Sequence, residues 1–464
     1  MPRRSGDHVH RKLSSPRSRR LSVWSSSSSS CTYASSSSTE TTSDDATYAP
    51  ESTESQELRS EIDKLLRAPF NIEPEMAGPL LQFPLDLYLR MRQEGGNVLL
   101  SPWHLACMLV VMYHGSGGDT RQQIARVLCT DDDGEIVSRF DCHASHLLCR
   151  DYRKARHTHS GLNVTSYNGL YHDARVNVSP EFKAPLSSLD LHVHIQDFSE
   201  SPEQSRLALD GFLRALTGFC FNRDVFAGDS VDLDTFVVLA SVFCFSSRWF
   251  VAGGPTRSTG DFYPEKDSRR PGSFCDRVET LCMTGRFQYA QFAENDGGAF
   301  EGIVLDLPYQ DPRRSLAMFI PAQTSSLEEL EKRLTAAMIL TCLARLGRRG
   351  PVEVTMPRMK VKCLTDLKHY LPSMGVVDAF SDSADFVNMA RIVGLRVSAA
   401  KHLAVFRTGL KGPEKSAVQV AAKETTRATS GTGVFKITVD RPFMFLVLAR
   451  NPDTVLMLGS FTHA

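Results

Sequence analysis

A cysteine and histidine set at regular spacing is the first group of residues that could do chemistry. Cys142, His146 and Cys149 recur at i, i+4 and i+7, so they would share one face of a helix. Thiolate and imidazole are ligands that zinc prefers, and a structural zinc site usually takes four of them. No fourth ligand is evident in the sequence. We therefore interpret the set as part of an ordinary helix and expect neither a metal nor another cofactor.

A short run of basic residues follows directly. Arg150, Arg153 and Lys154 are spaced so that they share one helical face, and Arg156 comes two residues later. Such a stripe attracts a sulfated polysaccharide as it attracts a phosphate backbone, through charge and the release of counterions. The alternative is a solvated helix face without a ligand. The sequence leaves both readings open.

A third candidate is an arginine within a long segment of small residues. Between Phe406 and Phe435 the chain has no helical period, whereas its flanks alternate apolar and polar residues as strands do. A long segment between two strands is usually disordered or a functional loop. Arg427 suits the buried carboxylate of a trypsin-like protease pocket, because a guanidinium pairs with a carboxylate through two hydrogen bonds. Alternatively, Arg427 only keeps an exposed loop soluble.

The usual signatures of enzymes are missing. The sequence contains no G-x-S-x-G, no Walker A and no H-E-x-x-H motif, so we expect a protein that is not an enzyme. Lys and Arg number 53, as do Asp and Glu, and this balance gives no indication of a nucleic-acid partner. No apolar run approaches the roughly 18 residues of a membrane span, so we expect no membrane partner either.

The N-terminal residues differ in composition from the rest. Residues 1–57 combine a basic cluster with runs of serine, and we predict that this tail is disordered because it lacks apolar residues to bury. No apolar stretch follows the basic residues, so no secretory signal is visible. We predict one folded domain over residues 58–464. The eleven cysteines are too sparse for a disulfide scaffold, and we expect most to be free thiols that fill core space.

The folded part contains many short motifs in a fixed order. Residues 97–128 predict a short strand, a Ser101-Pro102 turn, a buried helix and a second helix that begins at an Asp119-Thr120 cap, and residues 239–249 predict a long central strand. Further motifs lie at 168–171, 179–182, 260–263, 283–287, 307–309, 356–358 and 378–380. Together with VSAAKHLAVF and DRPFMFLVLARNPDTVLMLGSF, which flank the small-residue segment, this order resembles the serpin family over roughly residues 70–464.

The resemblance implies an α+β fold, with helices packed on three β-sheets and an exposed reactive-centre loop. It implies a serine endopeptidase inhibitor that acts as a suicide substrate: a protease cleaves the loop, which then inserts as a new strand into a five-stranded central sheet. It also implies a monomer outside the cell, although a cytoplasmic protein is the alternative because no signal peptide is visible. The basic stripe resembles a heparin-binding helix known in the family.

The resemblance also assigns positions in the loop. Counting from His402, the family's scissile bond falls at Thr426–Arg427 or at Arg427–Ala428. The implied hinge of the loop comprises Gly412, Pro413, Glu414, Lys415, Ser416 and Ala417. The implied cluster that controls opening of the sheet comprises Ser101, His104, Ser241 and His402. His402 has the residue type usual in the family, whereas His104 and Ser241 stand where the family has serine and asparagine.

Several loop residues depart from what insertion requires. Pro413 stands where the family has threonine, and proline lacks the N–H that a central strand needs. Lys415 and Lys423 share one face, and a buried unpaired lysine costs several kcal/mol. Val418 and Val420 lie on the opposite face, and a one-residue slip would exchange the two faces. The alternative hypothesis is therefore a non-inhibitory serpin that binds, carries or chaperones a partner.

Overall fold

The computed structural model describes residues 68–130, 135–148, 162–228, 230–251, 254–264, 275–293, 300–311, 313–348, 351–409 and 434–463. All of them lie in Thr53–Ala464, the second of the two units into which the chain divides. The predicted disordered tail, the loop hinge, the scissile candidates, the basic stripe and Cys149 lie outside the described residues.

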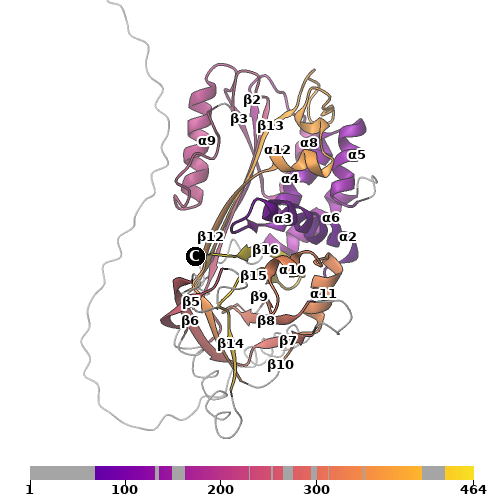
Figure 1. The fold of residues 1–464 in the computed structure, drawn as a ribbon. Coiled ribbons are helices and arrows are strands. Elements are labelled where there is room, and N and C mark those ends of the chain that lie inside the picture. The colour runs from indigo at the N-terminus through magenta and orange to yellow at the C-terminus, as the bar shows by residue number, and fades with distance from the viewer. Residues whose placement is uncertain are drawn as a thin grey trace, which may run out of the picture. The chain divides into compact units, whose positions relative to one another are not determined.

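The described strands form three sheets, which confirms the predicted α+β architecture with helices packed on three sheets (Figure 1). The central sheet has the order β12 (Lys360–Asp366), β13 (Val397–Thr408), β4 (Val237–Ser247), β2 (Asn163–Asp173), β3 (Leu191–Gln196). The second sheet has the order β1 (Leu99–Leu100), β16 (Thr454–Phe461), β15 (Phe443–Ala449), β9 (Arg314–Pro321), β8 (Gly302–Pro308), β7 (Gln288–Phe292), β10 (Gly347–Arg348). The third sheet has the order β14 (Phe435–Thr438), β11 (Val352–Pro357), β6 (Asp276–Gly285), β5 (Thr256–Phe262).

Helices cover both faces of the central sheet. Helix α9 (Pro202–Leu216) lies on one face, and the group around α4 (Pro102–Gly115) lies on the other (Figure 1). The remaining helical elements are α2 (Pro74–Ala77), η1 (Gly78–Gln82), α3 (Phe83–Gln93), α5 (Gly118–Val127), α6 (Ile136–Leu148), α8 (Pro180–Lys183), η2 (Ala184–Leu189), α10 (Leu327–Glu331), α11 (Ala336–Ala344), α12 (Leu367–Tyr370), η3 (Leu371–Met374) and η4 (Asp378–Phe380). Because both faces are covered, β4 and β13 are buried along almost their whole length.

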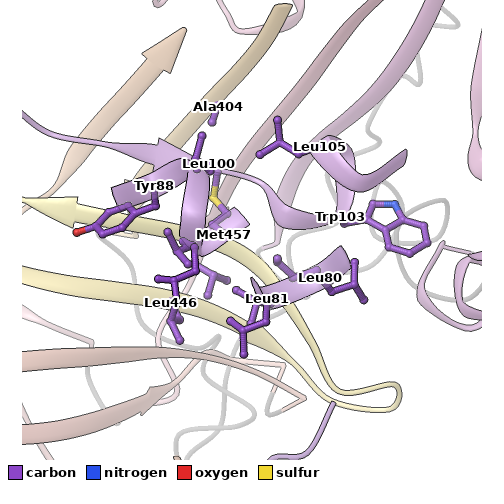
Figure 2. Packing of buried hydrophobic residues seen from close by; sticks show 14 of the residues in the cluster. Leu80, Leu81, Tyr88, Leu100, Trp103, Leu105, Ala404, Leu446 and Met457 are labelled. Carbon is purple, nitrogen blue, oxygen red and sulfur yellow. The ribbon is translucent and has the colours of Figure 1, made fainter. Parts of the chain in front are cut away.

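The main core lies between the central sheet and the second sheet. Helix α4 runs through it, and all of its residues except His114 are buried. Figure 2 shows side chains from helices and from both sheets meeting there, with Leu105 of α4 near Leu100 and Ala404, and Leu446 near Met457. A second, smaller apolar cluster lies between α9 and the other face of the central sheet. The central sheet is therefore held between two unequal cores.

One local expectation differs from the structure, and another is confirmed. Helix α5 begins at Gly118 and is capped by Gly117, so the predicted Asp119-Thr120 cap is wrong. Gly118 has φ +48°, a conformation that favours glycine, and this lets the helix begin one residue before Asp119. Every cysteine in the described ranges is free, and five of these nine lie in or against the cores, as expected: Cys107, Cys220 and Cys342 are buried, and Cys244 and Cys363 are partly buried.

Among the described residues, no helix has both the length and the apolar character that a membrane crossing requires.

Candidate functional site

The candidate site is the seam of the central sheet, by which we mean the pairing of β4 with β13. The two strands run parallel, and their paired residues extend from Val397 opposite Val237 to Thr408 opposite Ser247. The outer neighbours β2 and β12 are antiparallel to β4 and β13 respectively. The seam is thus a parallel pair between two antiparallel pairs. It is the place where the reactive-centre loop of the resemblance would insert.

A histidine joins the two strands of the seam through its side chain. His402 of β13 and Ser241 of β4 are opposite each other in the register, and Nδ1 of His402 lies 2.8 Å from Oγ of Ser241. The other ring nitrogen, Nε2, accepts a hydrogen bond of 3.0 Å from the backbone N–H of Ser101. Both side chains are fully buried. His402 therefore connects both strands of the seam to the residue that precedes α4.

The cluster continues from Ser101 across the sheet. Oγ of Ser101 donates to the carbonyl oxygen of Leu456 at 2.8 Å and lies 2.8 Å from Nδ1 of His104. Nε2 of His104 lies 3.0 Å from Oγ of Ser166, which is on β2. The hydrogen-bond chain thus runs from β4 through β13 and α4 to β2, and it includes Ser101, His104, Ser241 and His402.

The positions of the protons follow from counting donors. Because Nε2 of His402 accepts from a backbone N–H, the proton of this ring is on Nδ1 and is donated to the hydroxyl of Ser241. That hydroxyl in turn donates to Sδ of Met108 at 3.0 Å. Ser101 donates to a carbonyl, so it accepts from Nδ1 of His104. His402 is then neutral. A second proton on His402 would place two donors against each other at Ser101.

Burial acts in the same direction as this proton arrangement. Loss of hydration lowers the pKa of His402 to about 3. Burial also holds the pKa of His104 well below its usual range, and the neighbouring His402 lowers it further. The four residues therefore form a neutral, buried hydrogen-bond network at neutral pH.

A tryptophan and a glycine define the point at which the chain leaves β13. Nε1 of Trp249 donates to the carbonyl oxygen of Gly409 at 2.8 Å, and the buried Trp249 ring stacks on Tyr309 at 4.8 Å. A Cβ atom on Gly409 would lie 1.9 Å from the carbonyl oxygen of Ser247, so only glycine fits there. This contact holds residue 409 against the end of β4.

Long cationic side chains lie on the α9 side of the seam. Nζ of Lys401 lies 2.6 Å from the Asp366 carboxylate. Nζ of Lys362 donates to the carbonyl oxygen of Cys220 at 2.6 Å, and Arg407 contacts the thiol of the same cysteine. These side chains pass their methylene groups over the sheet and place their charges at its rim. The α9 side therefore tolerates cations, whereas the α4 side holds the neutral cluster.

Some residues of this site were missed by the sequence reasoning. Ser166, Met108 and Leu456 complete the hydrogen bonds of the cluster, and Trp249 holds Gly409. Their contacts join segments far apart in the chain, and no local pattern signals them. The scissile candidates, the hinge residues and the basic stripe are outside the described residues, so their roles stay predictions.

Comparison with known proteins identifies this arrangement. A family model described as Serpin (serine protease inhibitor) matches residues 80–464. The chain is 27% identical over 395 residues to Iris of Ixodes ricinus, which covers 84% of this chain and 99% of that protein. It is 26% identical over 374 residues to antithrombin-III of Homo sapiens, which covers 79% of this chain and 76% of that protein. The structure of uncleaved ovalbumin has the same fold, with a TM-score of 0.70 at 21% identity, and covers 84% of this chain and 100% of that one.

The neutral His402 predicts a loss of stability in acid. Its folded pKa of about 3 is below the ordinary value of 6.5, so the unfolded chain binds the extra proton first. The contribution of neutral His402 to the free energy of unfolding is complete above pH 6.5 and falls as the pH decreases toward 3. At pH 5 the loss is about 2 kcal/mol. Urea unfolding at pH 7.5 and 5.0 should show that the free energy of unfolding falls by about that much less in His402→Gln than in the original protein. Parallel pH profiles for the two proteins would contradict the assignment.

The hydroxyl of Ser241 predicts a specific loss of stability. Ser241→Ala leaves Nδ1 of His402 without its partner, and a buried donor without a partner costs about 1–3 kcal/mol. Ser246→Ala is the matched control, because Ser246 is half-buried on the same strand and its hydroxyl makes no hydrogen bond to any described residue. Urea unfolding at pH 7.5 measures both. Equal effects of the two substitutions would show that the cluster is not a stabilising network.

Proposed function

The chain belongs to the serpin family, and we propose that it inhibits a serine endopeptidase of trypsin-like specificity with residues 410–433 as its reactive-centre loop. The relatives it matches include antithrombin-III and Iris, and the family as a whole is described as serine protease inhibitors. In the proposal, the protease attacks the bond Arg427–Ala428 or its neighbour Thr426–Arg427. The catalytic serine is then acylated by the residue before the cleaved bond, and the loop inserts before that ester is hydrolysed.

The observation that carries the proposal is the connection around the seam. The chain leaves β13 of the central sheet at Gly409, against the end of β4. It next appears as β14 of the third sheet, which is parallel to β11. A segment that turned back from Gly409 would run antiparallel to β13 and also to β4, since these two are parallel. Insertion would replace one parallel ladder by two antiparallel ladders, and parallel pairing is slightly less stable per residue. The exchange therefore favours the inserted state.

The two sides of the seam also suit the two faces of the loop. Lys415, Gln419 and Lys423 alternate with Val418 and Val420. If the lysine face meets α9, its charges can reach the rim as those of Lys362 and Lys401 do. The valine face then meets the main core beside α4. We propose this register, which is one residue away from the register that the family resemblance implies.

Pro413 favours a second function. It lies at the start of the segment that would insert, and proline cannot donate to either new ladder. If this obstacle stops insertion, cleavage of the loop is followed by no rearrangement that could trap the protease. The protein would then be a non-inhibitory serpin that binds, carries or chaperones a partner. The experiment on protease complexes below separates the two functions.

The buried cluster supports a role in controlling the seam. Ser241 and His402 must separate if a strand enters between β4 and β13, because their hydrogen bond crosses the gap. Breaking it leaves two buried polar groups to find new partners. We propose that the cluster of Ser101, His104, Ser241 and His402 keeps the sheet closed until the loop is cleaved.

The basic stripe supports a glycosaminoglycan as a second ligand. Arg150, Arg153, Lys154 and Arg156 share the spacing described above, and antithrombin-III is among the relatives. We propose that a heparin-like polysaccharide binds this stripe. Such a ligand places the protein outside the cell. Asn163, exposed at the start of β2 and followed by Val164 and Thr165, would then be a glycosylation site.

Incubation with trypsin tests the inhibitory proposal. The full chain should form a complex with trypsin that survives denaturing electrophoresis, because the ester is trapped. Arg427→Ala should remove this complex, since the S1 pocket loses its guanidinium partner. Lys423→Ala is the matched control, a loss of the same charge in the same segment, and should keep the complex. Mass spectrometry of the released peptide identifies the bond: a peptide that begins at Ala428 supports Arg427 in the S1 pocket, whereas one that begins at Arg427 puts Thr426 there and contradicts recognition of the guanidinium.

Cleavage at Arg427 without a stable complex, and without a rise in Tm of the cleaved protein, would support the non-inhibitory function instead. A rise in Tm without a complex indicates that the loop inserts too slowly to trap trypsin. In that case Pro413→Thr should restore the complex, because threonine supplies the missing N–H.

Heparin chromatography tests the basic stripe separately. The double variant Arg153→Ala, Lys154→Ala should elute from heparin at a clearly lower salt concentration than the original protein. With two cations fewer, binding releases fewer counterions from the polysaccharide and is therefore weaker. Arg257→Ala with Arg277→Ala is the control with the same loss of charge, since both are surface residues of the third sheet. Equal elution shifts in the two double variants would identify the stripe as an ordinary solvated surface.

A further inference from the structure

Two free cysteines lie at the C-terminal end of α9, on the α9 side of the seam. Cys244 is on β4, and its thiol donates to the carbonyl oxygen of Leu216, the last residue of α9, at 4.0 Å. Cys220 follows Leu216 by four residues. Both cysteines belong to the smaller apolar cluster between α9 and the sheet, where Cys220 is buried and Cys244 is partly buried. One strand of the seam and the segment after α9 therefore each bring a thiol to this cluster.

The register of the sheet places Cys220 over the seam, beside Cys244. Lys362, Val405 and Cys244 are paired in one row that crosses β12, β13 and β4. The ammonium group of Lys362 donates to the carbonyl oxygen of Cys220 at 2.6 Å. The guanidinium of Arg407, two residues along β13 from Val405, contacts the thiol of Cys220. Cys220 is thus held over β13, and Cys244 extends from the next strand, about 4.8 Å away.

The electrostatics of Cys244 agree with this placement. Burial, together with the neighbouring Cys220, raises the pKa of the Cys244 thiol to about 12, against a smaller opposing effect of Arg407. Cys220 and Arg407 are therefore both near the thiol of Cys244. Reactive cysteines typically lie beside such cations, because the thiolate is the nucleophile. Arg407 contacts Cys220 directly, so Cys220 is the thiol that we expect to react first.

We propose that Cys220 and Cys244 form a disulfide bond under oxidising conditions. Hydrogen peroxide first oxidises the thiol of Cys220 to a sulfenic acid, and one molecule of water is released. The thiol of Cys244 then loses its proton and attacks the sulfur of Cys220, and the hydroxyl group leaves with that proton as a second molecule of water. In total, two thiols and one peroxide give one disulfide and two molecules of water. Such a bond persists outside the cell, where the proposed polysaccharide ligand places the protein.

The bond would fasten the segment after α9 to β4 of the seam. Lys362 and Arg407 already hold the same segment to β12 and β13. A strand that inserts between β4 and β13 must separate these attachments, and a covalent bond does not yield as a hydrogen bond does. We therefore expect the oxidised protein to insert its loop more slowly. This consequence rests on the proposed inhibition, whereas the bond itself does not.

Peptide mapping of the full chain tests the bond directly. The protein is reduced, freed of reductant and treated with a small excess of hydrogen peroxide; the remaining thiols are alkylated, and the digest is analysed by mass spectrometry. The peptide of Cys220 should be joined to that of Cys244. Cys282→Ser removes another partly exposed thiol, on β6 of the third sheet, and should leave this link intact. Alkylated Cys220 and Cys244 in the oxidised sample would overturn the proposal.

Thermal unfolding gives a second measurement of the same bond. A disulfide between residues 220 and 244 closes a loop of the chain, so oxidation should raise the Tm by about 2–6 °C, and dithiothreitol should reverse the rise. Cys220→Ser and Cys244→Ser should each lose the rise, because neither variant can form the bond. An equal rise in either serine variant would show that the oxidation acts elsewhere in the chain.

Complex formation with trypsin separates this proposal from the proposed inhibition. The oxidised protein should give less of the complex that survives denaturing electrophoresis, and more cleaved chain, than the reduced protein. Cys220→Ser should give the same amount of complex with and without peroxide. If neither form of the protein gives a complex, the proposed inhibition fails, while linked peptides still support the disulfide. Equal amounts of complex from both forms would show that the bond does not restrain the seam.

Discussion

The parallel pairing of β4 with β13 is the constraint on which the rest of this structure depends. Both strands are buried on both faces, so neither can move without exposing one of the two cores. The hydrogen bond between His402 and Ser241 closes the pair on the α4 side, and the contact of Trp249 with Gly409 closes it at the end where the chain leaves β13. The helices on the two faces of the central sheet are packed around this one pair.

The two sides of the seam have different chemistry, so the separation of β4 from β13 is opposed differently on each side. On the α4 side the groups are neutral and each has its partner, so separation of the strands has a defined cost. On the α9 side, Lys362, Lys401 and Arg407 reach the rim, and their charges remain near solvent or polar atoms whatever lies between the strands. Beyond the main-chain ladder, an added strand is thus opposed by the side-chain hydrogen bond between His402 and Ser241, which lies on the α4 side.

Much of the fold was predictable from the sequence, because burial leaves a local pattern. The apolar run of β4 and the buried helix α4 were expected, and the fixed order of short motifs indicated the family, which the comparisons confirm. The start of α5 was predicted wrongly because Gly118, in a left-handed conformation, moved the helix start before the expected cap. The partners of the cluster were not predictable, since Ser166 meets His104 only after β2 pairs with β4. Such contacts depend on register between distant segments, which no periodicity encodes.

Helix α9 would have to respond to the proposed insertion of the loop. Its inner face packs on Val238, Ala240 and Leu403, which belong to the two strands of the seam. A strand inserted between β4 and β13 would move these residues apart by roughly 4.8 Å, the usual spacing of strands, and α9 would have to shift its packing. The packing of α9 on the seam therefore opposes insertion together with the buried cluster on the α4 side.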